Sequence, residues 1–122
     1  MGIVAAAAWT IQAGMSFNLV CTGTITSRLG TEPTTERIRV DLESRRYCFD
    51  DCRRVTPIAQ VTDGEIVFEQ DAPGAGTMPI DRRVDRANWQ YVSRVQLAGG
   101  EIRTVAQCEV QPFTGFGAAT RK

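Results

Sequence analysis

The stretch NWQYVSRVQLAGGEIRTVAQCEV, residues 88–110, decides the fold class of this chain. Apolar and polar side chains alternate on both sides of Gly99-Gly100, and this period of two is typical of strands with one buried face. A Gly-Gly pair between two such segments favours a two-residue hairpin turn. The inward residues would then pair as Leu97–Ile102, Val95–Thr104, Ser93–Ala106, Tyr91–Cys108 and Trp89–Val110. Because a one-residue slip would move every one of them to the opposite face, the pattern and the turn agree on an antiparallel hairpin.

A second hairpin is indicated earlier in the chain. Asp63-Gly64, a favoured type I′ turn pair, separates Ile58–Thr62 from Glu65–Gln70. This turn would pair Val61 with Ile66, so that apolar side chains meet on one face.

The N-terminal half shows the same period of two. Inward positions are predicted at Phe17, Leu19, Cys21, Gly23 and Ile25, and again at Ile38, Val40 and Leu42. Polar residues alternate with both sets, except at Val20, and we expect the loop Arg28–Pro33 to separate the two strands.

These segments predict one all-β domain. At 122 residues with 43% hydrophobic content, the chain has room for one core. We expect six to eight short antiparallel strands in a meander that closes as a barrel or a sandwich. The domain is predicted to span residues 14–112, with a loose C-terminal tail over 113–122. Asp71–Pro79 reads as a loop.

Residues 1–13 resemble a secretory signal peptide in composition. Ile3–Ile11 is apolar apart from Thr10, and small residues follow at a plausible cleavage point near Gly14. The positively charged start of such a signal is missing. The run is too short to cross a membrane, so we expect no transmembrane span. The alternative is an apolar segment that packs on the domain or frays.

Composition narrows the class of function. The chain carries 14 basic and 14 acidic residues, whereas nucleic-acid binders usually have a basic excess that neutralises phosphates. Histidine is absent, which removes the commonest general base and the commonest metal ligand. We therefore expect no nucleic-acid partner, no cofactor, no metal and no catalytic residues.

The four cysteines predict two disulfides. Cys21 and Cys108 lie on the inward faces of the first and last strands, and Cys48 and Cys52 are close enough in sequence to pair in any fold. Disulfides imply an oxidising compartment, in agreement with the signal-like N-terminus. The alternatives are a Cys₄ zinc site, whose usual pairs of close cysteines are only half present, and free thiols in a cytosolic protein.

The segment RRYCFDDCRR, residues 45–54, is the main candidate for an interaction site. If its cysteines pair, the ring would push Phe49, Asp50 and Asp51 outward, between arginines that can clamp acidic groups. The candidate interaction residues are Arg45, Arg46, Phe49, Asp50, Asp51, Arg53 and Arg54. The alternative is a solvated turn whose charges neutralise one another.

Three other groups have plainer interpretations. The charged run Ile80–Arg86 suggests an edge strand or turn that discourages aggregation. Calcium binding by Asp50, Asp51, Asp81 or Asp85 lacks the usual loop spacing. Trp89 and Tyr91 are expected in the core rather than on a ligand-stacking surface.

The sequence thus favours a non-catalytic domain, exported to the periplasm or the medium of a bacterium, that binds another protein or an envelope component through residues 45–54. One alternative is a small hydrolase that uses carboxylates alone, such as Asp50 with an acidic partner. Another is an intracellular protein that uses its cysteines for metal binding or structure. Ligand identity and oligomeric state have no signature in the chain.

Overall fold

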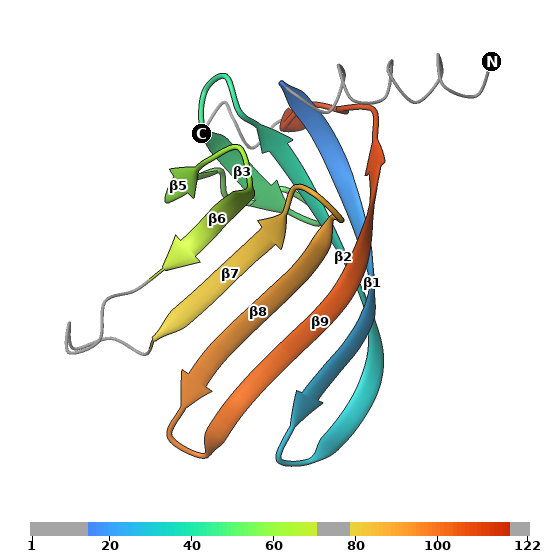
Figure 1. Ribbon diagram of the computed structural model, residues 1–122, viewed down its shortest axis with the longest axis vertical. Coiled ribbons are helices and arrows are strands. Elements are labelled where there is room, and N and C mark those ends of the chain that lie inside the picture. Colours follow the sequence, from blue (N-terminus) through green and yellow to red (C-terminus); the bar gives the residue numbers. More distant parts are fainter. Residues whose placement is uncertain (1–14, 71–78, 118–122) are drawn as a thin grey trace.

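A computed structural model describes residues 15–70 and 79–117, which form one antiparallel sheet that curls into a half-barrel (Figure 1). The all-β prediction is therefore confirmed. The strands are β1 (Ser16–Ser27), β2 (Gly30–Asp41), β3 (Arg46–Phe49), β4 (Thr56–Pro57), β5 (Gln60–Val61), β6 (Glu65–Gln70), β7 (Ile80–Asp85), β8 (Gln90–Leu97) and β9 (Gly100–Gln111). The signal-like residues 1–13 lie outside the described residues, as does nearly all of the loop expected at Asp71–Pro79.

The described strands number nine, so the expected six to eight is wrong. The sequence pattern missed β3 and β4, because strands of four and two residues are too short to show a clear alternation. The predicted closure into a barrel or a sandwich stays a prediction.

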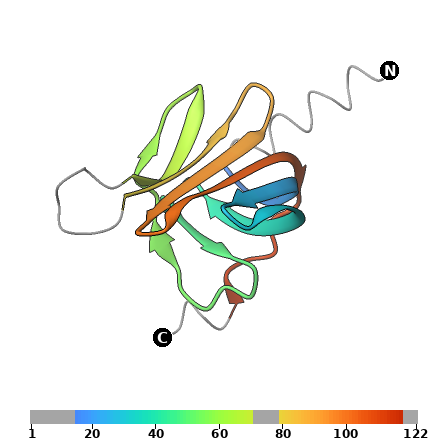
Figure 2. The same cartoon turned by 90° about the horizontal axis from the view of Figure 1, so that it is seen from below.

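The spatial order of the strands is β4-β3-β2-β1-β9-β8-β7-β6-β5. The two edge strands, β4 and β5, are separated in the chain only by Ile58 and Ala59. Ile58 N donates to Arg45 O at 2.9 Å, and Ala59 N donates to Val67 O at 2.9 Å. Adjacent residues thus bond to opposite ends of the sheet, which holds the curl (Figure 2).

The β8–β9 hairpin forms, but its register differs from the predicted one by two residues. Its turn is Ala98-Gly99, and Val95 lies opposite Ile102 instead of Thr104. A two-residue shift leaves every side chain on its predicted face, since the strand period is two. Gly100 has φ 132° and pairs with Leu97 directly after the turn, so the glycine conformation is needed beside the turn and not within it.

The β1–β2 hairpin has the same construction. Its turn is Arg28-Leu29, and Gly30, with φ 128°, follows it as the first residue of β2. The predicted loop Arg28–Pro33 is therefore wrong from Gly30 onward. Pro33 is tolerated because β3 pairs only with residues 38–41 of β2 and leaves an unpaired outer edge beside Pro33.

The Asp63-Gly64 turn is confirmed in place, with Val61 opposite Ile66. Neither residue has a positive φ, so the turn is not type I′. Instead, the hydroxyl oxygen of Thr62 accepts hydrogen bonds from the backbone N–H groups of Gly64 at 3.2 Å and Glu65 at 3.1 Å.

The concave face of the sheet carries the main core. Its buried residues come from β1, β2, β3, β6, β7, β8 and β9, together with Ile58, and include Phe17, Leu19, Cys21, Ile38, Val40, Tyr47, Ile66, Phe68, Val84, Tyr91, Ala106 and Cys108. Trp89 packs against this core, with its ring centroid 5.5 Å from that of Phe17, so both Trp89 and Tyr91 are core residues as predicted. No helix long and apolar enough to cross a membrane occurs in the part of the chain that the structure describes.

Candidate functional site

The disulfide Cys21–Cys108 joins β1 to β9 in the middle of the sheet. Cys108 N donates to the O atom of Trp89, directly before β8, at 2.8 Å, so the backbone groups of Cys108 point away from β1. Cys21 and Cys108 therefore form a non-hydrogen-bonded pair, in which facing residues approach most closely. Both side chains are buried.

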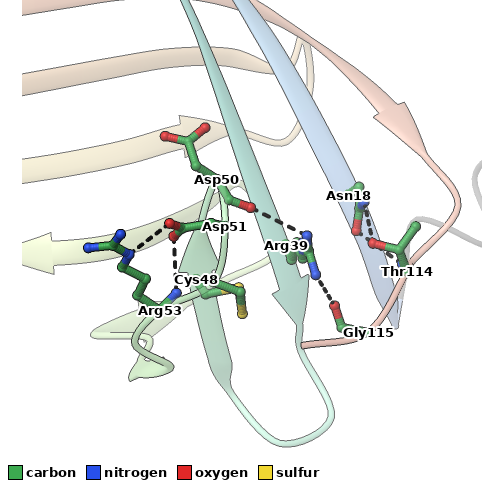
Figure 3. The surroundings of a disulfide bond; sticks show 9 residues. Asn18, Arg39, Cys48, Asp50, Asp51, Arg53, Thr114 and Gly115 are labelled. Atoms are coloured by element: carbon green, nitrogen blue, oxygen red, sulfur yellow. Dashed lines mark hydrogen bonds and ion pairs between the residues drawn. A yellow bond between two sulfur atoms is a disulfide. The ribbon is translucent and has the colours of Figure 1, made fainter. Parts of the chain in front are cut away.

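The second disulfide, Cys48–Cys52, closes the segment that follows β3 (Figure 3). Both cysteines are only 1% exposed, and they form a separate small core with Phe116, packed by Val55 and Phe113. The ring is thus anchored in a second apolar cluster near the edge of the sheet.

The backbone of this segment adopts conformations that L-residues rarely take. Asp50 and Cys52 have φ values of 43° and 58°, and Arg45, in the turn before β3, has a φ of 56°. Asp50 N donates to Arg37 O at 2.8 Å, and Cys52 N donates to Phe49 O at 2.7 Å. These bonds and the disulfide hold a strained conformation that the free peptide would leave.

The structure separates the seven candidate interaction residues into two groups. Asp50, Asp51, Arg53 and the flanking Arg45 and Arg54 are exposed. Arg53 pairs with Asp51 at 2.9 Å, but both side chains remain largely in solvent, where such pairs contribute little stability. In the described part of the chain, Arg45 and Arg54 make no ion pair.

The other two candidates contact the apolar clusters, although Arg46 is also exposed. Phe49 does not point outward as expected: it packs against the main core, 5.5 Å from the ring of Tyr47. Alternation explains this, because Phe49 lies opposite Ile38, which is an inward position. Arg46 lies over the ring of Phe116 at 5.4 Å.

The C-terminal segment is part of the same region. Arg39 bridges it to the loop, donating to Gly115 O at 2.9 Å and to Asp50 O at 3.4 Å. Asn18 donates to Thr114 Oγ1 at 2.9 Å (Figure 3). Residues 113–117 are therefore packed and not loose as expected, and residues 118–122 lie outside the described range.

The charged run predicted as an edge is instead an inner strand, since β7 pairs with both β6 and β8. Arg82 lies on the concave face, opposite Ser93, and forms an ion pair with Glu69. A β-bulge between Val67 and Glu69 turns Glu69 to this face. The guanidinium of Arg82 also lies over the ring of Phe49 at 5.5 Å.

The polar cluster of Arg82, Glu69 and Glu36 on the concave face was not predicted from the sequence. The alternation of side chains along the strands could have indicated it for Arg82 and Glu36. Arg82 has the same parity as the buried Val84, and Glu36 the same as the buried Ile38. Glu36 lies opposite Cys21 and close to Asp50, the carboxylate for which the sequence suggested an acidic partner.

Burial shifts the titration of this cluster. Desolvation raises the pKa of Glu36, the Tyr91 hydroxyl and Arg82 oppose this rise, and Asp50 adds to it. Desolvation raises the pKa of Tyr47 to about 12 and also raises the pKa of Tyr91. Both tyrosines are therefore neutral hydrogen-bond donors at physiological pH.

Comparison with protein-family models, with curated proteins and with solved structures gives no significant match. In residues 15–70 and 79–117, no group of three or more histidine, cysteine, aspartate or glutamate side chains is arranged to hold a metal ion.

Proposed function

We propose that this chain is an exported, non-catalytic β domain that binds another protein or an envelope component through the loop Arg45–Arg54. Two disulfides in a small β domain are compatible with a stabilised extracellular domain. Export to the periplasm or the medium is part of the proposal.

The observation that carries the proposal is the strained backbone of the disulfide loop. Two non-glycine residues of the ring, Asp50 and Cys52, keep left-handed conformations, as does Arg45 before β3, each at a cost of about 1–3 kcal/mol. Such strain concentrates at ligand clamps and binding loops, where a fixed shape reduces the entropy lost on binding.

The division of the loop into buried and exposed parts supports the same conclusion. Its apolar members, Phe49 and the two cysteines, pack inside, while its charged members remain in solvent. Arg45 and Arg54 are exposed cations, so the partner surface is expected to carry acidic groups that guanidinium can bind in a fork geometry.

The test is affinity capture from an envelope extract of the organism that makes the protein. The variant Arg53→Glu/Arg54→Glu reverses charge in the loop without touching the disulfide cluster. Its matched control is Arg94→Glu/Arg103→Glu, which reverses two exposed charges that face each other on β8 and β9.

The proposal expects one partner to be retained by the natural protein and by the control, and lost with the loop variant. Cys48→Ala/Cys52→Ala keeps every loop charge but releases the backbone, so it should weaken capture as well. Equal capture by the loop variant and the natural protein would exclude the loop as the binding surface.

A further inference from the structure

The two disulfides of this chain differ in how strongly the fold keeps them closed. Cys21–Cys108 closes a long segment and joins two strands that are paired in register. Cys48–Cys52 closes a ring between cysteines only 4 residues apart, so it restricts the unfolded chain much less. The same ring holds Asp50 and Cys52 at φ values of 43° and 58°, and opening the ring would release the free energy stored in these conformations. Cys48–Cys52 is therefore the disulfide that a reductant opens more readily at equilibrium.

Burial keeps reductants away from this disulfide in the folded chain. A reducing thiolate must reach a sulfur atom directly, and Cys48 and Cys52 are each only 1% exposed. Phe116 is buried with them, and Phe113 packs against the same cluster, with its ring centroid 5.4 Å from that of Phe116. Residues 113–117 thus form part of the cover that shields the sulfur atoms.

This cover is attached by contacts that can break while the sheet stays intact. Asn18 on β1 donates to Thr114 Oγ1 at 2.9 Å and accepts from Thr114 N at 3.3 Å, and both bonds are exposed to solvent (Figure 3). Arg39 on β2 donates to Gly115 O at 2.9 Å. Residues 113–117 lie outside the strands, and segments of this kind open locally at a lower free energy than the whole fold.

The other disulfide is protected in a different way. Cys21 and Cys108 face each other on two long paired strands, β1 and β9, and their side chains belong to the main core. A reductant reaches them only when the central strands of the sheet separate, which requires unfolding of the domain. The two disulfides thus differ in kinetic access as well as in equilibrium.

We propose that Cys48–Cys52 is a reversible redox switch, that residues 113–117 gate it, and that its reductant is a dithiol. When the gate opens, one thiolate of the dithiol attacks a sulfur atom of the pair, the S–S bond breaks, and a mixed disulfide forms. The second thiol of the reductant then displaces the protein sulfur, so that both cysteines become thiols and the dithiol becomes a disulfide. The dithiol supplies the two electrons and the two protons. This inference does not depend on the proposed binding function of the loop.

The test is reduction of the full folded chain with dithiothreitol at neutral pH, with samples alkylated over time and analysed by mass spectrometry. We expect the first product to carry two alkylated thiols, at Cys48 and Cys52, while Cys21–Cys108 stays closed.

Amide resonances of the reduced chain, before alkylation, show what the switch does. Those of Asp50, Cys52 and Arg53 should shift, because the left-handed conformations are no longer held. Those of Leu19 on β1 and Tyr91 on β8 should stay in place, because the main core is intact. Re-oxidation should restore the loop resonances.

A pair of variants tests the gate. Asn18→Ala removes both bonds to Thr114 without touching the disulfide cluster, and it should speed the reduction of Cys48–Cys52 about three- to tenfold. Thr26→Ala is the matched control, because it loses one exposed side-chain bond, to Thr31, at the other end of the same strand. This control should leave the rate unchanged.

Phe116→Ala removes part of the cover itself and should speed the reduction as well, once its amide spectrum has shown the natural fold. Resistance of the folded chain to dithiothreitol, reduction of both disulfides together, or loop resonances that reduction leaves unchanged would overturn the proposal. Equal rates in Asn18→Ala and Thr26→Ala would overturn the assignment of residues 113–117 as the gate.

Discussion

Gly23 lies on β1 directly opposite Ala106 of β9, where the two strands leave no room for a side chain. A Cβ atom at this position would lie 2.0 Å from Val105 O and 2.5 Å from the Ala106 Cα. Both are backbone atoms, so relief requires the central strand pair to separate. The requirement for glycine here comes from a close approach, a property of the packed sheet that alternation in the sequence does not reveal.

Gly23→Ala is therefore expected to destabilise the domain by about 2–4 kcal/mol. Gly64→Ala is the matched control, because its Cβ would have no neighbour closer than 4.0 Å and its φ is not positive. That change should be neutral or stabilising by up to about 1 kcal/mol. Urea unfolding measures both, and a Gly23→Ala variant as stable as Gly64→Ala would contradict the β1–β9 packing.

Glu36 makes stability depend on pH in a direction opposite to that of a salt-bridged carboxylate. Because its pKa is raised in the folded state, the folded chain holds this proton more tightly than the unfolded chain. The contribution of Glu36 is thus fully present below the ordinary pKa of 4.5 and is lost as pH rises through the raised value. The groups that face Glu36 are Tyr91, Arg82 and Asp50.

Glu36→Gln removes this loss. We expect the variant to gain stability over the natural protein between pH 4 and pH 7, with urea unfolding at the two pH values as the measurement. A stability difference that is the same at both pH values would show that Glu36 is not desolvated in the fold.

At the level of elements, the two disulfides act on segments of different length. Cys21 and Cys108 are 87 residues apart in the sequence, and Cys48 and Cys52 are 4 residues apart. In the chain-entropy account the first restricts the unfolded chain by about 4–5 kcal/mol and the second by about 2 kcal/mol. All four cysteines are buried, so both pairs lose similar packing when they are replaced.

Cys21→Ala/Cys108→Ala should therefore cost about 2–3 kcal/mol more than Cys48→Ala/Cys52→Ala. The midpoints of urea unfolding, compared at equal slope, give this difference. Equal costs, or the reverse order, would mean that local packing around Phe116 outweighs chain entropy.

The elements also divide into those that the sequence could predict and those that it could not. The long strands were predictable, because each keeps one buried face over many residues, as β9 does from Ile102 to Val110. β3 and β4 were not, since strands of four and two residues are too short to show an alternation. The β8–β9 register was missed because two adjacent glycines leave the position of the turn open.

In the molecule as a whole, the curl of the sheet brings charged side chains of distant strands together on its concave face. The alternation of side chains along β2 and β7 is enough to place Glu36 and Arg82 on the concave face, although this was not predicted, and only the fold brings them near Tyr91 and Asp50. The main candidate loop was found from composition, whereas the inward direction of Phe49 and the packing of residues 113–117 required long-range contacts that no local pattern contains. The contacts of residues 113–117 hold this C-terminal segment against the 45–54 loop.

Two disulfides tie the first long strand of this domain to the last one and separately close the 45–54 loop. Tryptic mapping without reduction, on protein exported by its natural host, tests this directly. Cleavage after arginine should give the peptide ending at Arg28 linked to Thr104–Arg121, and an unlinked peptide YCFDDCR (residues 47–53) lighter by two hydrogens than its reduced form. Linkage of YCFDDCR to either terminal peptide, or four free thiols, would contradict the account.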